Sequence, residues 1–248
     1  MKNQRRMLCF AGRCAKEIAR DPLTLFFGLA FPLLLLLMLS LIQANIPVDL
    51  FRIEHLAPGV AVFGQSFLAL FSALLLSRDR STAFLTRLYS TPMTAPDFLA
   101  GYLLPLLPMA LVQDVIVYAV SLALGLTFSI NILWALLAGM IPALLYIALG
   151  LLCGTLLNDK QVGGICGALL TNLSAWLSGI WFDISLLGGA FGAVCKVLPF
   201  YHAVEGCRAA LNGTGGVLMH LAVVLAYALA LLAMAAWCFA RKMKRGGS

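Results

Sequence analysis

Six long apolar runs constrain the fold of this chain more than any other feature of its sequence. They cover residues 23–41, 59–77, 99–124, 132–157, 162–181 and 217–240. A helix needs about 20 consecutive, mostly apolar residues to cross the hydrocarbon core of a bilayer. Only 11% of the residues are charged, whereas a soluble domain carries about 25%. We therefore predict an all-α integral membrane protein, with six transmembrane helices in one domain that spans residues 1–248.

The positions of the Lys and Arg residues predict how the chain is oriented. With the N-terminus placed inside, all of the basic residues except Arg52, Lys196 and Arg208 fall in predicted cytoplasmic segments. Cytoplasmic segments of membrane proteins carry such an excess, so both termini are predicted to be cytoplasmic. The net charge of +7 then reflects topology and contact with anionic membrane lipids, and not a nucleic-acid site.

The first 21 residues predict an amphipathic helix that lies in the cytoplasmic interface. Met7, Ala11 and Ile18 recur at helical spacing, with Cys14 or Ala15 between them. A disordered basic tail is the alternative. The basic and acidic residues of this segment fall on other faces: Arg6, Arg13, Lys16, Glu17 and Arg20. Asp21 suits an N-cap and Pro22 a first helical turn, so the chain is expected to begin crossing the membrane there.

Asp114 is the one acidic residue that the predicted spans place deep in the membrane. A polar residue in lipid is a functional candidate by default, so a proton or substrate site is one interpretation. A carboxyl group that is hydrogen-bonded to a neighbouring helix is the other. The chain has no GxSxG or HExxH motif and no phosphate-binding GxxxxGK[ST] loop, so no catalytic or ATP site is predicted on it. Energy for transport must then come from an ion gradient or from another subunit.

Glycine and cysteine spacings carry weaker predictions. Gly150 with Gly154, and Gly163 with Gly167, form GxxxG patterns that let helices approach closely. No CxxC pair is present among the seven cysteines. Only Cys195 and Cys207 share a predicted exterior segment, and the sequence does not decide whether they form a disulfide.

The predicted exterior segment, 183–216, contains an apolar part at 186–198 that is too short to span a membrane. It fits a re-entrant or interfacial helix that breaks at Pro199.

The charged, Thr- and Pro-rich stretch at 78–97 separates the second and third runs on the predicted cytoplasmic side. Ser81 or Thr82 can cap a short helix, Thr91-Pro92 ends it, and Pro96 can start the next helix with Ala95 before it. A simple reversal of direction needs only two to eight residues. The pattern predicts a helix–break–helix that docks onto a partner, and a solvated interfacial loop is the alternative. The short helix combines an apolar side with basic residues: Phe84, Leu85 and Leu88 beside Arg80 and Arg87.

Four motifs together resemble the permease subunits of ABC-2-type exporters. They are "RDP" before the first run, "FP" within it, "FLTRLYSTPM" before the third, and "LPFYHAVEGCRAALNG" before the last. The resemblance implies six membrane helices, an N-terminal interfacial helix, a cytoplasmic coupling helix at 78–97 and re-entrant helices before the last span. It also implies two permeases, the second a copy or a sister chain, paired with two separate ATP-binding subunits that hold ATP and Mg.

Within the coupling stretch, Leu88, Thr91 and Pro92 match the Leu…Thr-Pro core of the family, and Leu85 matches its preceding apolar position. An acidic residue and Gly-Thr commonly precede this core, whereas Ala83, Phe84 and Thr86 stand there in this chain. The "EAA…G" loop of importer permeases is not found, which favours export. The residues expected to couple to the ATPase are Arg80, Phe84, Leu85, Arg87, Leu88, Thr91 and Pro92.

The resemblance implies the function of the membrane subunit of an ATP-driven exporter, in a bacterial cytoplasmic membrane. Its cargo would be amphipathic, such as a drug, a peptide or a lipid-like molecule. In the family the second and fifth spans line the path, which here suggests Phe63, Gln65, Ser66, Phe67, Asn172, Trp176 and Trp181. Ordinary helix packing with an aromatic belt is the alternative for each of these residues. The second candidate function is a gradient-driven transporter or channel that uses Asp114. The third candidate is a non-transporting membrane anchor or sensory partner.

Overall fold

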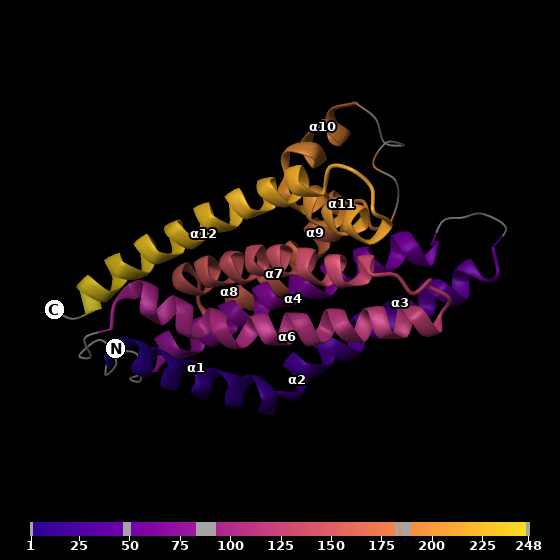
Figure 1. The fold of residues 1–248 in the computed structure, drawn as a ribbon. Coiled ribbons are helices and arrows are strands. Elements are labelled where there is room, and N and C mark those ends of the chain that lie inside the picture. The colour runs from indigo at the N-terminus through magenta and orange to yellow at the C-terminus, as the bar shows by residue number, and fades with distance from the viewer. Residues whose placement is uncertain (1, 47–50, 83–92, 182–183, 185–188, 247–248) are drawn as a thin grey trace.

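A bundle of helices forms the part of the chain that the computed structural model describes, namely residues 2–46, 51–82, 93–181, 184 and 189–246. No strand occurs within these ranges, so the predicted all-α class is confirmed there. Long helices lie side by side, and both termini lie at the same end of the bundle (Figure 1). We call this the terminal end. The topology prediction assigns it to the cytoplasm.

The helices follow the apolar runs closely. Within the described ranges, five helical stretches are long and apolar enough to cross a membrane: Pro22–Asn45, Ile53–Ser81, Ala95–Ala123, Asn131–Leu156 and Val217–Met243. In chain order the elements are α1 (Lys2–Arg20), α2 (Pro22–Leu25), the π-helical η1 (Phe26–Ala30), α3 (Phe31–Gln43), α4 (Ile53–Ser81), α6 (Ala95–Ala123), α7 (Asn131–Leu156), α8 (Asp159–Val162), the π-helical η2 (Gly163–Leu170), α9 (Thr171–Ser178), α10 (Gly189–Val197), α11 (Pro199–Asn212) and α12 (Val217–Gly246).

The predicted fifth span, 162–181, is the one run that does not appear among these five stretches. Its residues are helical from Asp159 to Ser178, through α8, η2 and α9. This run of roughly 20 residues is about 30 Å long, which is close to the thickness of a bilayer core. Figure 1 shows it leading from the terminal end at α8 towards the opposite end at α9. An even number of crossings places both termini at one end, so six spans remain the prediction.

α4 is the central helix of the bundle. It packs on α7, α6, α3 and α11, and its residues are buried along nearly the whole length. A helix that is hydrophobic all round is expected to be buried in this way. α4 begins at Ile53, before the start of the second apolar run at residue 59, and contains Pro58. Glu54 lies in the first turn, where a negative charge stabilises the positive end of the helix dipole.

Small residues bring α4 and α7 into backbone contact, as one GxxxG pattern predicted. A Cβ atom on Gly154 would lie 2.6 Å from the carbonyl oxygen of Ala73, and one on Gly150 would overlap the backbone of Ala69. The second pattern does not bring two backbones together, since a Cβ atom on Gly167 would lie 3.3 Å from the side chain of Leu70 in α4. A Cβ atom on Gly163 would meet nothing within 4 Å, because this residue lies on an exposed face of η2.

The first segment is helical, as predicted, but its apolar face is covered by protein. Phe10 of α1 makes edge-to-face contacts with Phe98 and Tyr102 of α6, with ring centroids 5.9 and 4.9 Å apart. Gly101 of α6 provides the space for the Phe10 ring, which a Cβ atom there would overlap. Cys14 and Ile18 of α1 are also buried. The side of α1 that was expected to face lipid is therefore used for packing on α6.

Two shorter helices lie between α9 and α12 in the described part of this segment, α10 and α11. α10 ends at Val197 and α11 begins at Pro199, so the predicted break at Pro199 is confirmed. α11 is too short to cross a bilayer and packs on α12, α7 and α4. Cys195 and Cys207 are both buried free thiols, so no disulfide joins them.

Candidate functional site

The last turn of α4, residues 78–81, forms the first part of the predicted coupling stretch 78–97, and it is bonded to helices on several sides. Asp79 in this turn is only 4% exposed. Its carboxylate accepts hydrogen bonds from Nη1 and Nη2 of Arg13 in α1, at 2.7 and 2.8 Å. The hydroxyl of Tyr102 in α6 donates a third bond at 2.8 Å. One buried carboxylate therefore joins three helices.

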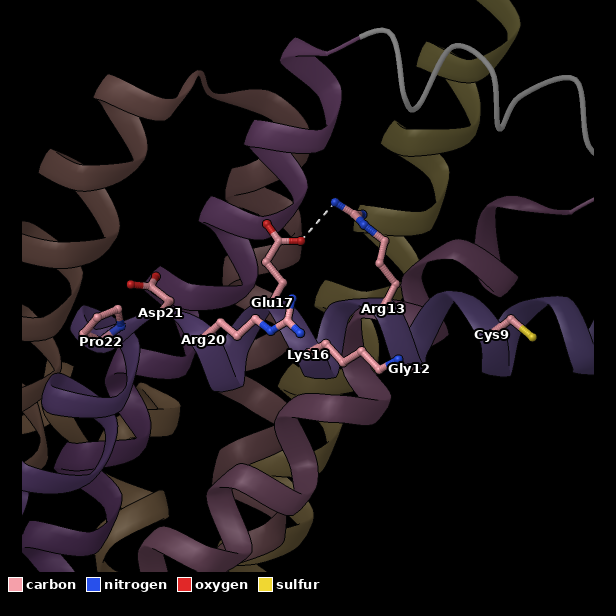
Figure 2. Close-up of a pocket in the computed structure, with 8 residues that line it drawn as sticks. All are labelled: Cys9, Gly12, Arg13, Lys16, Glu17, Arg20, Asp21 and Pro22. Atoms are coloured by element: carbon pink, nitrogen blue, oxygen red, sulfur yellow. Dashed lines mark ion pairs between the residues drawn. The ribbon is translucent and has the colours of Figure 1, made fainter.

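Arg13 supplies the charge that balances Asp79. The two parallel N–H bonds form the bidentate geometry that makes Arg–carboxylate pairs strong. Arg13 also lies 2.9 Å from Oε2 of Glu17 one helical turn on, an ion pair that Figure 2 shows on the α4 side of α1. The hydrogen bonds to Asp79 raise the pKa of Arg13 above its usual value, so the guanidinium stays charged.

Arg80, the next residue of α4, is bonded to a different helix. Its guanidinium donates to the carbonyl oxygens of Gly154, Thr155 and Leu157 at the end of α7. Lys242 of α12 donates to the same Thr155 oxygen at 2.6 Å. The last carbonyls of a helix lack partners within that helix, and cations are favourable there because of the helix dipole. Asp79 and Arg80 together thus connect the end of α4 to α1, α6 and α7.

Most of the predicted coupling residues lie outside the described residues: Phe84, Leu85, Arg87, Leu88, Thr91 and Pro92. The two ends of this stretch are described. Ser81 is the last residue of α4, and Thr94 caps α6 through reciprocal bonds with Asp97. Pro96 lies in the first turn of α6, as predicted. The predicted docking helix is therefore bounded at the terminal end by two helices whose ends are fixed.

Asp114 is buried between α4, α6 and α7, where it accepts a hydrogen bond. Nε2 of Gln65 donates to Asp114 Oδ2 at 2.7 Å and to the Gly139 carbonyl oxygen at 2.9 Å. A Cβ atom on Gly139 would lie 2.5 Å from the same carboxyl oxygen, so a larger residue here would displace the Asp114 carboxyl group. These contacts fit the second interpretation of Asp114, a carboxyl group that is hydrogen-bonded to a neighbouring helix. Asp114 Oδ1 and Gln65 Oε1 have no hydrogen-bond partner among the described residues.

The predicted path residues of α4 are all buried within this chain. The Phe63 ring lies 5.8 Å from that of Phe67 and 5.6 Å from that of Trp181. Phe27 and Phe31 of the first span pack on the same rings. Ser66 donates within its own helix, to the Phe63 carbonyl oxygen at 2.6 Å. The structure thus gathers three predicted residues in one aromatic cluster and pairs a fourth, Gln65, with Asp114.

Asn172 and Trp176 lie on a different surface. They are exposed, together with Leu169 and Leu173, on one stripe of η2 and α9. The Asn172 amide donates to the Ala168 carbonyl oxygen at 2.8 Å, within the helix. The seven predicted path residues are therefore not gathered around one cavity in a single chain.

Comparison with protein families decides the class of the protein. A family model described as ABC-2 type transporter matches residues 7–212. The chain belongs to the ABC-2 type transporter family. No curated protein matches it. The matched region runs from α1 to the end of α11 and includes the bonded end of α4. The protein is thus a multi-pass membrane permease subunit of the ABC transporter class, in a family whose permeases normally work with an ATP-binding subunit.

The ABC-2 permease contains site residues that sequence reasoning missed. Asp79 was not singled out, because the apolar run ends at Ser77 and "SRDRS" resembles a solvated turn. Arg13 was assigned only to a polar face of α1. The available signal was the length of the helix: extending α4 by one turn places Asp79 on the face of the buried residues Leu75 and Leu76. Within the described ranges no group of three or more His, Cys, Asp or Glu residues could hold a metal ion.

Proposed function

We propose that this permease is the membrane subunit of an ATP-driven exporter, energised by a separate subunit that binds ATP and Mg. The partner would dock on residues 83–92 and their flanks. The observation that carries the proposal is the bonded end of α4, in a chain of the ABC-2 family. A helix that leads into a docking segment transmits displacement only if its end is fixed to the helices that must move.

In this mechanism Asp79 and Arg80 transmit the motion of the partner. Movement of the docking segment would displace the last turn of α4, and with it α1 and α6 through Asp79 and α7 through Arg80. Alternating access in transporters is largely a rigid-body movement of groups of packed helices, so we expect helices joined by these charged hydrogen bonds to move together. The permease would thus change shape without a nucleotide site of its own.

A second permease, either a copy or a sister chain, would complete the path. The support is the stripe on η2 and α9, where Asn172 is exposed among Leu169, Leu173 and Trp176. An amide side chain that faces lipid is energetically unfavourable. The stripe is therefore better suited to contact with another protein chain. The aromatic cluster around Phe63 and the sparse amides favour an amphipathic cargo such as a drug, a peptide or a lipid-like molecule.

The direction of transport gives one prediction. Inverted membrane vesicles should accumulate an amphipathic dye when ATP is added outside, because export from the cell becomes uptake into an inverted vesicle. Right-side-out vesicles loaded with ATP should lose the dye. Uptake in the opposite orientation would show import. Membranes that contain the ATP-binding subunit without the permease are the control and should do neither.

Asp114 distinguishes this proposal from a gradient-driven transporter, which its unpartnered oxygen Oδ1 favours as the second candidate. In the ATP-driven account Asp114→Asn changes transport and ATP hydrolysis by no more than about fivefold, because the Gln65 bond can still be made and even its loss would cost only about 1 kcal/mol. Dye transport and ATP hydrolysis are measured on the same vesicles. Loss of transport with intact ATP hydrolysis would instead assign Asp114 an ion-coupling role.

A further inference from the structure

The outer face of α1 carries basic side chains that the fold does not use. Lys16 and Arg20 are exposed, and neither has an ion-pair or hydrogen-bond partner among the residues that the structure describes. The two neighbouring acids are occupied. Glu17 pairs with Arg13, and Asp21 accepts bonds from Leu23 and Thr24. Two positive charges at this position are therefore left for a ligand outside the chain.

The same face borders an open hollow of about 960 Å³ (Figure 2). In that view Arg13 and Glu17 project from α1 towards α4, and Lys16 and Arg20 extend along α1 beside them. The described residues that line the hollow are Cys9, Gly12, Arg13, Lys16, Glu17, Arg20, Asp21 and Pro22.

The position of α1 identifies the kind of ligand. The first membrane-spanning stretch begins at Pro22, two residues after Arg20. Lys16 lies one helical turn before Arg20, a distance of about 6 Å along the axis. Both charges thus lie within about one Debye length, roughly 8–10 Å, of the level at which the chain enters the membrane.

The apolar face of α1 cannot supply this contact. Phe10, Cys14 and Ile18 are buried against the bundle, and Leu8 is the one large apolar side chain of α1 that is strongly exposed. Interfacial helices usually bind by inserting an apolar face and adding electrostatic attraction. Here only the electrostatic part is available.

We propose that Lys16 and Arg20 of α1 bind the phosphate groups of anionic phospholipids in the cytoplasmic leaflet, by charge alone. The proximity of both residues to the first span favours lipid over an acidic protein surface. Lipid binding to α1 would also constrain the position of α4, since Arg13 of α1 is hydrogen-bonded to Asp79 of α4. It does not depend on the proposed ATP-driven function and is tested without the ATP-binding subunit.

A thiol at Gly12 reports the contact directly. Gly12 is exposed on the outer face, and a Cβ atom there would meet nothing within 4 Å, so Gly12→Cys fits without strain. Cys9, also exposed, is replaced by Ala in the same chain. Burial raises the pKa of the Cys14 thiol to about 12, which keeps that neighbour unreactive. The full chain is reconstituted in vesicles of phosphatidylcholine, with or without phosphatidylglycerol, and labelled with an uncharged maleimide.

We expect phosphatidylglycerol to slow labelling of Gly12→Cys about fivefold or more, and high salt to reverse this. Adding Lys16→Gln and Arg20→Gln should restore the rate seen in phosphatidylcholine. Arg78→Gln with Lys160→Gln is the matched control, since it removes two exposed charges at the same end of the bundle and should leave the protection intact. A thiol placed at Lys160 corrects for general effects of an anionic surface.

Equal labelling in both lipids would overturn the proposal. It would also be overturned if the protection persisted after Lys16 and Arg20 were neutralised. Protection that appears only when the ATP-binding subunit is added, and equally in both lipids, would assign this face to a protein partner instead.

Discussion

Replacing Gly150 and Gly154 of α7 with alanine should separate α7 from α4 and leave little folded permease. Cβ atoms at these positions would meet the backbone of Ala69 and Ala73, which cannot rotate away as a side chain can. Overpacking of this kind costs about 1–3 kcal/mol at each site, and the better helix propensity of alanine offsets only about 1 kcal/mol of it. Among the described helices, α4 and α7 make the most extensive contact.

The measurement is the thermal unfolding temperature of the purified chain in detergent, together with the yield of monodisperse protein. Gly163→Ala with Gly164→Ala is the matched control. It makes the same chemical change on the exposed face of η2, where neither Cβ atom would meet anything within 4 Å. Equal unfolding temperatures for the two double variants would show that α4 and α7 are not in backbone contact.

The second large effect is expected from Arg13→Gln, which should uncouple ATP hydrolysis from transport and destabilise the chain. The substitution leaves the buried Asp79 carboxylate with the Tyr102 hydroxyl as its charge-stabilising donor. Removing one partner of a buried ion pair costs about 3–5 kcal/mol, and we expect about 2–3 kcal/mol here because the Arg13 side chain is 39% exposed. Asp79→Asn on the Arg13→Gln background should recover part of that loss, since it removes the unpaired charge.

Unfolding temperature and the ratio of dye transported to ATP hydrolysed are measured for each single variant and for the pair. Glu17→Gln is the control. It removes the other acidic partner of Arg13, but this pair is more than one-third exposed on both sides and should contribute less than about 1 kcal/mol. If Glu17→Gln and Arg13→Gln had the same effect on coupling, the Asp79 bond would not be the element that transmits motion.

Long-range polar pairs are the part of this molecule that its sequence does not reveal. The apolar runs predict where the membrane helices lie, because one requirement, covering about 30 Å of hydrocarbon, governs each run separately. Pro96 and Pro199 mark helix starts for an equally local reason, the fixed backbone of proline. Gln65 and Asp114 are 49 residues apart, and Arg13 and Asp79 are 66 apart. Helical periodicity indicates the face on which such a residue lies, but not the residue that it meets.

The first segment shows the same limit in a different way. Its spacing of apolar residues correctly predicts an amphipathic helix, yet spacing alone cannot distinguish a face that enters lipid from one that packs on protein. Gly101 of α6 makes the difference, because the missing side chain leaves room for Phe10. A glycine in a distant apolar run gives no sign of the ring that occupies its space.

The most direct test of the account is whether an ATP-binding subunit docks on residues 83–92. Tagged permease is co-expressed with the ATP-binding subunit and purified, and the subunit should co-purify with the wild-type permease. It should not co-purify with the triple variant Leu85→Asp, Leu88→Asp, Thr91→Asp, whose unfolding temperature should equal that of the wild type. Aspartates at the exposed positions Gln4, Ala15 and Lys160 serve as the control and should retain it. Failure of the wild type to bind the subunit, or undiminished binding by the triple variant, would contradict the account.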